Sequence, residues 1–243
     1  MESSNPAFSS RAIDALRRST AGSGTMTVGG TATKTLILLL VTSFSAGMVW
    51  TSADPATYRS AMLIGTIGGL VFALATSFKP QWAPITAPLY AVLEGLALGA
   101  ISAIYNAQFR GLPMMAVAAT MITAVLLFAV YRTGLIKVTD RMRAVAGMAL
   151  LGLMGTYLVH FIMGFFGTGI PLINSSSMFG IGFSVLTTGL AAFFLLLDMD
   201  RVEQMARSGL PKSMEWYGAF AFLVTLVWLY LEMLRLLSKL QRR

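Results

Sequence analysis

Seven long apolar segments run through this chain, and they constrain its fold more than any other feature. A helix needs about 20 predominantly apolar residues to cross a bilayer, and each of the seven segments comes close to that length. The connections between them are short, which leaves little room for a soluble domain. The sequence therefore predicts an all-α membrane protein built as a seven-transmembrane-helix bundle. The predicted spans are roughly residues 33–50, 59–78, 86–106, 112–132, 144–166, 175–197 and 216–237.

The composition agrees with this class. Of the 243 residues, 56% are hydrophobic and only 12% are charged, and the mean hydropathy is +0.73, which is far from the values of a soluble domain. The chain contains no cysteine, which excludes disulfides, thiol nucleophiles and thiolate metal sites. The net charge of +8 does not indicate nucleic-acid binding, because Lys and Arg lie between and beside the apolar runs, where they set topology.

The chain divides into a polar tail and one membrane domain. Residues 1–32 are rich in Ser, Thr, Gly and Arg and lack an apolar core, which predicts a flexible tail. We expect no cleavable signal peptide, because the first apolar stretch begins only after Lys34; a mitochondrial presequence is the competing interpretation. Residues 33–243 form the predicted seven-helix domain. Small residues in Ile64–Gly69 and Gly147–Gly155 predict close contacts between helices.

The distribution of Lys and Arg predicts the topology. If all seven segments span, the tail and the even-numbered loops carry 12 of these residues and the opposite loops carry 2, which places the N-terminus in the cytoplasm. The C-terminal end does not fit, because Arg235, Lys239, Arg242 and Arg243 would then lie outside. Either the last segment re-enters and returns, which is tolerated only in a buried position, or the rule fails at this terminus.

Three carboxylates lie within or directly beside apolar segments. Glu232 is near the end of the last segment, Asp198 follows the sixth, and Glu94 lies inside the third. Charged side chains at membrane depth are costly and are retained mainly where they function. These acids therefore indicate a proton or cation path rather than a soluble active site.

Three stretches of the sequence resemble the Bax inhibitor-1 family, also called the TMBIM or YccA-like family. They are LLLDMDRV (Leu195–Val202), EWYGAFAFLVTLVWLYLEMLRLL (Glu215–Leu237) and EGLALGAIS (Glu94–Ser102). The resemblance covers nearly the whole chain, and NPAF and TMTVGGTATKT near the start are similar to a bacterial branch of the family.

The resemblance implies a bundle with a central last helix and an acid on each of the last two helices. In the family, this acidic pair shares a proton and gates a pH-dependent calcium leak. Asp198 matches the first acid through DMDRV, and Glu232 matches the second through LYLE. Two like charges in one poorly solvated site cannot both ionise cheaply, so protonation can act as a switch.

The length of the connection between these two helices argues against the pairing. If the sixth helix ran to about Ala206 and the seventh began near Ser213, Asp198 would lie ~12 Å and Glu232 ~28 Å from the turn, at 1.5 Å per residue. The acids would then miss each other. Asp200 or Glu94 would be the alternative partner or part of the ion path.

Structural interpretations compete with these functional ones. Glu232 and Arg235 are spaced i and i+3 and could neutralise each other. The acids from Asp198 onward could be the solvated end of the sixth helix, and Glu94 could make a buried hydrogen bond to a neighbouring helix. The only histidine, His160, is suited to a pH sensor; the competing interpretation is a structural hydrogen bond to a neighbouring group. Lys79 is the nearest candidate for the family's basic latch.

We expect no enzyme, because the sequence contains no HExxH, GxSxG or P-loop motif. The first functional hypothesis is a pH-sensitive calcium leak channel or H⁺/Ca²⁺ exchanger of the bacterial inner membrane, with no cofactor. Asp198, Glu232 and Glu94 would be transient Ca²⁺ ligands. The alternative is a non-transporting modulator of a membrane-bound AAA protease or of cell-death and stress signalling, in which the N-terminal tail engages the partner. The oligomeric state stays open.

Overall fold

The computed structural model describes residues 24–52, 54–168, 170, 173 and 175–242. Within these residues seven long helices follow one another, and each is long and apolar enough to cross a membrane. They confirm the predicted all-α, seven-helix membrane class. The helices are α2 (Val28–Trp50), α3 (Pro55–Phe78), α4 (Ala83–Gln108), α5 (Leu112–Arg132), α6 (Asp140–Phe165), α8 (Met178–Arg207) and α9 (Met214–Gln241), with a short 3-10 helix η2 (Pro80–Trp82) before α4.

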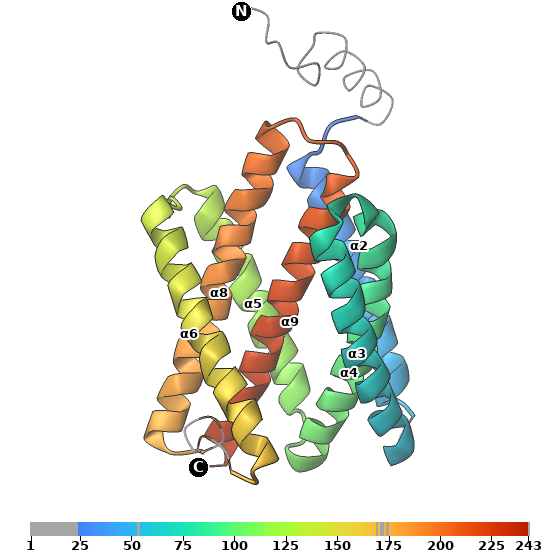
Figure 1. The fold of residues 1–243 in the computed structure, drawn as a ribbon, viewed down its shortest axis with the longest axis vertical. Helices are drawn as coiled ribbons and strands as arrows, with labels where there is room; N and C mark the ends of the chain where they lie inside the picture. The colour runs from blue at the N-terminus through green and yellow to red at the C-terminus, as the bar shows by residue number, and fades with distance from the viewer. Residues whose placement is uncertain (1–23, 53, 169, 171–172, 174, 243) are drawn as a thin grey trace, which may run out of the picture.

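The helices run alternately up and down, and α9 lies in the middle. The described chain starts at one end of the bundle and finishes at the other (Figure 1). The α3–α4, α5–α6 and α8–α9 connections lie at the end where α2 begins, which we call the N-terminal end. α9 packs against α2, α4, α5 and α8, which confirms the prediction of a central last helix.

Local signals explain where the helices begin. Thr27, Thr139 and Ser177 each accept a hydrogen bond from a backbone N–H of the following turn, and so cap α2, α6 and α8. Asp54 caps α3 in the same way, and Pro55 occupies the first helical position. The hydrogen bond from the Ala56 N–H, together with those from Thr57, holds the pKa of Asp54 below its ordinary value.

Glycines bring α2, α3 and α4 into close contact. A Cβ on Gly65 of α3 would lie 2.5 Å from the Leu93 carbonyl oxygen, and one on Gly95 of α4 would lie 2.5 Å from the Thr42 carbonyl oxygen of α2. The prediction of close packing is therefore confirmed for the glycines of Ile64–Gly69. It is wrong for Gly147–Gly155 of α6, because a Cβ on any of its three glycines would meet nothing within 4 Å.

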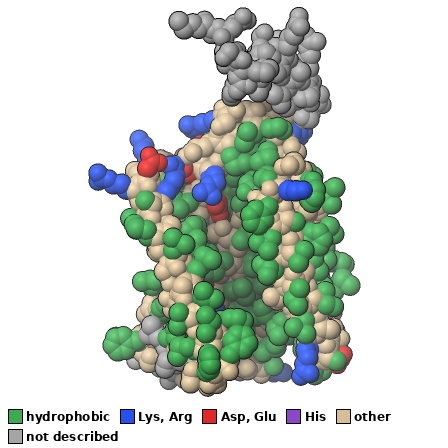
Figure 2. Space-filling view, viewed as in Figure 1, with side chains coloured by type: hydrophobic (Ala, Val, Ile, Leu, Met, Phe, Trp, Pro, Cys, Tyr) green, Lys and Arg blue, Asp and Glu red, His purple; other side chains and the backbone are tan. Residues whose placement is uncertain are grey.

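Apolar side chains cover the outside of the bundle. Figure 2 shows a broad hydrophobic band, with Lys, Arg, Asp and Glu gathered mainly toward the two ends. α6 is the most peripheral helix: it packs mainly against α8, and Ala146 and Leu153 are its buried residues. This distribution is that of an integral, multi-pass membrane protein surrounded by lipid.

The folded chain begins before the predicted boundary at residue 33. α2 starts at Val28, and the segment before it is bonded to the α8–α9 connection: the Met26 N–H donates to the Leu210 carbonyl at 2.7 Å. Residues 1–23 of the predicted tail lie outside the described residues.

A buried carboxylate holds this segment in place. Glu215 at the start of α9 has no exposed surface, accepts hydrogen bonds from the Thr27 N–H and hydroxyl at 3.0 Å each, and forms an ion pair with Lys34 of α2. The same end of the bundle therefore contains both the start of the described chain and the α8–α9 turn.

The last helix crosses the bundle once. α9 continues without a break to Gln241 and does not turn back, so the re-entrant alternative is wrong. Lys239 and Arg242 consequently lie at the end opposite Thr27. They are exceptions to the concentration of Lys and Arg at the N-terminal end.

Candidate functional site

Asp198 lies buried in the seam between the antiparallel helices α8 and α9. Asp198 is 7% exposed, and its carboxylate accepts a hydrogen bond from the Thr225 hydroxyl at 2.5 Å. Asp198 precedes the last residue of α8, Arg207, by nine positions, and Thr225 follows the first residue of α9, Met214, by eleven. Because the two helices run in opposite directions from a short turn, these positions reach similar depths.

Glu232 lies deeper along α9, in a separate polar cluster. It is 2% exposed and accepts hydrogen bonds from the Thr187 hydroxyl of α8 at 2.8 Å and the Tyr157 hydroxyl of α6 at 3.1 Å. Arg235 donates to the same carboxylate at 2.9 Å and also donates to Tyr157. The cluster therefore ties α6, α8 and α9 together.

The structure does not bring Asp198 and Glu232 together. Glu232 follows Thr225 by seven positions in α9, which is about 10 Å along the helix axis. An apolar cluster fills the seam near these levels, and its buried members are Ala191, Leu195, Met199, Leu226 and Leu229. The proton-sharing pair is therefore not formed here. The arithmetic on helix length is confirmed, because α8 ends at Arg207 and α9 begins at Met214.

Thr225 is the functional candidate that sequence reasoning missed. It occupies the place facing Asp198 that the resemblance assigned to Glu232. Equal counting from the turn does not find it, because Asp198 lies nine positions from the end of α8 and Thr225 lies eleven from the start of α9. A threonine carries no signal of its own, since hydroxyls are common in membrane helices and usually bond to their own backbone.

The two alternative partners also lie elsewhere. Asp200 forms an ion pair with Arg143 of α6 at 2.5 Å and accepts from Gln204 at 2.7 Å. Glu94 is half-buried at the α3–α4 contact, where a Cβ on Gly69 would lie 3.0 Å from its Oε2 atom. Neither acid bonds to Asp198 or Glu232 within the described part of the chain.

His160 and Lys79 make local contacts. The Nδ1 atom of His160 accepts a hydrogen bond from the Ile170 N–H at 3.0 Å, in the connection after α6. The Lys79 ammonium lies 4.2 Å from the ring centre of Trp82, and among the described residues it has no acidic partner. The latch between Lys79 and Asp198 is thus not formed in this structure.

The interpretation of Glu232 and Arg235 as a neutralising i,i+3 pair is confirmed as geometry, although the pair is largely buried rather than solvated. Lys239 adds a second cation at this end: it is 3% exposed and donates to the Gly180 carbonyl at 2.9 Å. Over the described ranges, no group of three or more His, Asp or Glu side chains is close enough to hold a metal ion. Asp198, Glu232 and Glu94 therefore do not converge on one Ca²⁺ site in this conformation.

The arrangement can do two things chemically. A buried carboxyl with one hydroxyl partner can gain and lose a proton, and the apolar cluster beneath it closes the seam to ions.

A family profile described as Bax inhibitor 1 like matches residues 5–242, which is nearly the whole chain. Comparison with curated proteins and with solved structures yields no match. The seven membrane helices and this match together show that the chain belongs to the Bax inhibitor 1 like family.

Proposed function

We propose that this protein passes cations slowly across the bilayer, as a pH-sensitive Ca²⁺ leak or H⁺/Ca²⁺ exchanger, with Asp198 as the group that responds to pH. The observation that carries the proposal is the burial of Asp198 in the α8–α9 seam with Thr225 as its hydrogen-bond partner. Ionisable side chains inside a membrane domain most often serve ion or proton pathways. Carboxylate oxygens are also hard ligands that suit Ca²⁺.

Protonation of Asp198 favours the closed seam in this mechanism. A neutral carboxyl hydrogen-bonded to Thr225 is compatible with the apolar neighbours Leu195 and Leu229, whereas an ionised carboxylate is costly without water. Loss of the proton therefore draws water into the seam and separates α8 from α9. The driving term is hydration of one acid, because Glu232 is too distant to add direct repulsion.

The cluster around Glu232 provides a second barrier at the far end. Its carboxylate is already neutralised by Arg235, and Lys239 lies one turn further along α9. The cluster of Glu232, Arg235 and Lys239 therefore has a net positive charge, which repels a permeating cation. The path opens fully only when the α8–α9 contact loosens over its whole length, which agrees with a slow leak rather than a fast channel.

The test is calcium influx into liposomes that contain a calcium dye, measured at about pH 6 and about pH 8, which bracket the range where a buried carboxyl titrates. The wild type is compared with Asp198→Asn and with Asp140→Asn, an exposed acid at the start of α6 that serves as the matched control. We expect greater influx at the higher pH for the wild type and the control, and low, pH-independent influx for Asp198→Asn.

Influx that equals that of empty liposomes, with protein shown to be folded by its helical circular dichroism, contradicts the transport proposal. An unchanged pH response in Asp198→Asn contradicts the role of Asp198 while leaving transport intact. Glu232→Gln separates the two barriers: we expect it to lower influx at both pH values, because Arg235 loses its counterion and the positive charge at the far end increases.

The alternative proposal is that the protein modulates a membrane-bound AAA protease or cell-death and stress signalling without any flux of its own. One observation favours it: residues 24–27 are held against the α8–α9 connection, so any function of the preceding residues is exerted at that end. We propose that this end faces the cytoplasm of a bacterial cell.

Removing residues 1–23 tests this alternative and keeps Met26 and the Thr27 cap in place, whereas a deletion through residue 30 would remove both, which belong to the packed structure. We expect the shorter deletion to change turnover of protease substrates while liposome influx stays at the wild-type level. Unchanged turnover, together with no protease in the purified complex, rejects this alternative.

A further inference from the structure

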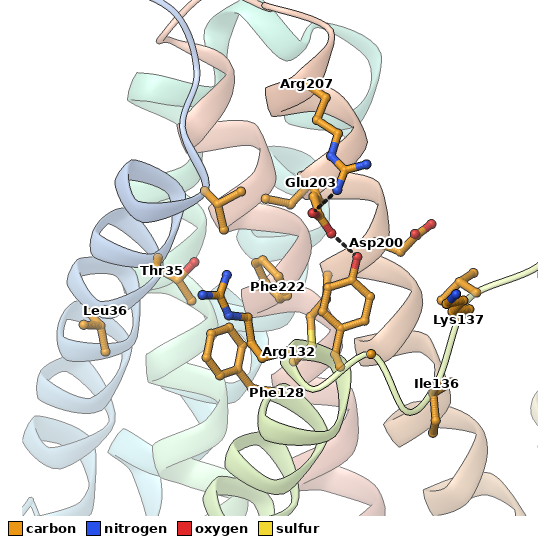
Figure 3. A pocket seen from close by; sticks show the side chains of 17 residues that line it. Thr35, Leu36, Phe128, Arg132, Ile136, Lys137, Asp200, Glu203, Arg207 and Phe222 are labelled. Atoms are coloured by element: carbon orange, nitrogen blue, oxygen red, sulfur yellow. Dashed lines mark hydrogen bonds and ion pairs between the residues drawn. The ribbon is translucent and has the colours of Figure 1, made fainter.

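A crevice separates α2 from α5 at the N-terminal end of the bundle. Its volume is about 690 Å³, and it is lined by α2, by α5 and the connection that follows it, and by α8 (Figure 3). Phe222 of α9 lies between these walls. α2 packs mainly against α4 and α9, whereas α5 packs mainly against α9 and α8. The two bordering helices therefore have no extended interface with each other, which leaves the crevice between them.

The acids in the wall of this crevice are already neutralised. Asp200 is paired with Arg143 at 2.5 Å, and Glu203 is paired with Arg207 at 2.6 Å and also accepts from the Tyr131 hydroxyl. Ion pairs at these distances leave little charge with which to attract a further cation.

Two cations remain without an acidic partner among the described residues. They are Arg132, the last residue of α5, and Lys137 in the connection to α6. Both are exposed. Figure 3 shows the Arg132 guanidinium directed across the crevice toward Thr35 of α2. The crevice therefore carries a net positive charge and is suited to an anion.

The surface beneath these cations is apolar. Phe128, one turn before Arg132, is 50% exposed, and Leu36 on α2 is 62% exposed. Both line the crevice. A cationic mouth at the end of a membrane helix above an apolar wall matches a molecule with an anionic head and an apolar chain.

We propose that this crevice binds one anionic phospholipid, with its phosphate at Arg132 in the positive field of Lys137 and an acyl chain over Leu36 and Phe128. A guanidinium at a helix end offers several donors to phosphate oxygens. Basic pockets between membrane helices are suitable sites for anionic head groups. The inference stands independently of cation transport, since it uses neither Asp198 nor Glu232.

The experiment measures lipid binding to the full-length purified protein in detergent. Phosphatidylglycerol and phosphatidylcholine of the same chain length are titrated, and binding is followed by native mass spectrometry and by the thermal unfolding midpoint. We expect the wild type to retain one phosphatidylglycerol and to be stabilised by it, with a much smaller effect of phosphatidylcholine. Replacing both cations in Arg132→Gln/Lys137→Gln is expected to weaken phosphatidylglycerol binding by about thirtyfold.

The matched control is Arg59→Gln/Arg110→Gln, which removes two exposed cations at the opposite end. It should bind phosphatidylglycerol as the wild type does. A second variant, Ala32→Trp, fills the crevice from α2 without changing charge and should also release the lipid.

Three results overturn the proposal: equal binding of the two lipids by the wild type, equal loss of phosphatidylglycerol in the two charge variants, or stabilisation by free glycerol 3-phosphate as large as that by the lipid. The last result would identify a soluble phosphate compound as the occupant.

Discussion

In the proposed mechanism, Thr225 sets how Asp198 responds to protons. Its hydroxyl donates to the carboxylate at 2.5 Å, and such a bond favours the ionised form of the acid. A hydroxyl therefore takes the place of the second carboxylate that the sequence resemblance implied. The consequence is a site with one titrating group, whose pH response is a single step.

Thr225→Val should shift this response to higher pH. Without the donor, ionisation of Asp198 costs more, so opening requires a lower proton concentration. A hydrogen bond to a charged group contributes about 1.5–3 kcal/mol, which corresponds to a shift of about one to two pH units in the midpoint of calcium influx. The measurement is liposome influx across a pH series, with Thr66→Val on the lipid-facing side of α3 as the control.

An unchanged midpoint in Thr225→Val would show that the hydrogen bond does not control the leak. A midpoint that moves to lower pH would contradict the sign of the argument. Neither result tests the role of Asp198 itself, which is tested by Asp198→Asn.

Gly30 is required by the ion pair at the N-terminal end. A Cβ at this position would lie 2.2 Å from the Glu215 Oε1 atom, whereas a Cβ on Gly29 would meet nothing within 4 Å. Gly30→Ala should therefore push Glu215 away from Thr27 and Lys34 and lower the free energy of unfolding by about 1–3 kcal/mol. Gly29→Ala should not. The check is the thermal unfolding midpoint in detergent, and equal midpoints for the two variants would contradict the packing argument.

At the scale of helices, α4 and α6 are opposites. α4 is packed between α2 and α3 through glycines, and α6 presents its glycines to open space. Few side chains hold α6 to the bundle, and Tyr157 is one of them through its bonds with Glu232 and Arg235. Motion of α6 against α8 would therefore disturb the far cluster before it disturbed the α2–α3–α4 unit.

This contrast predicts different costs for the same substitution. Gly95→Ala in α4 forces a methyl group against the Thr42 carbonyl and should destabilise the protein by about 1–3 kcal/mol. Gly152→Ala in α6 should be neutral or slightly stabilising, because alanine is the better helix former and nothing lies within 4 Å. Unfolding of the two variants in a denaturing detergent compares them directly. Equal destabilisation would show that α6 is packed against something in the membrane.

At the scale of the whole molecule, the seven spans place Lys212 and Arg242 at opposite ends of the bundle. The chain has no native cysteine, so single cysteines can be introduced at both positions, which are exposed. In intact cells, a membrane-impermeant thiol reagent should label Arg242→Cys and leave Lys212→Cys unlabelled until the membrane is opened. The cysteine-free protein supplies the background.

Labelling of both positions from one side would contradict seven spans. The reverse pattern would place the N-terminal end outside and would make the charge-based orientation wrong. Since Lys239 and Arg242 lie at the less basic end, this measurement also decides whether the remaining Lys and Arg residues are sufficient to orient the chain.

The sequence by itself determined the class of the protein and the number of its spans, and its resemblance to the family implied the central position of α9. These properties depend on apolar runs about as long as a bilayer is thick, which are read directly along the chain. The tertiary structure alone decided which polar groups meet. Each residue of offset in a helix boundary moves a side chain by 1.5 Å in depth and turns it by about 100°, so facing positions depend on the lengths of both helices and of their connection. For that reason Asp198 bonds to Thr225, and Glu232 bonds to Tyr157 and Thr187. The crevice beside Arg132 could likewise not be predicted from any local sequence pattern.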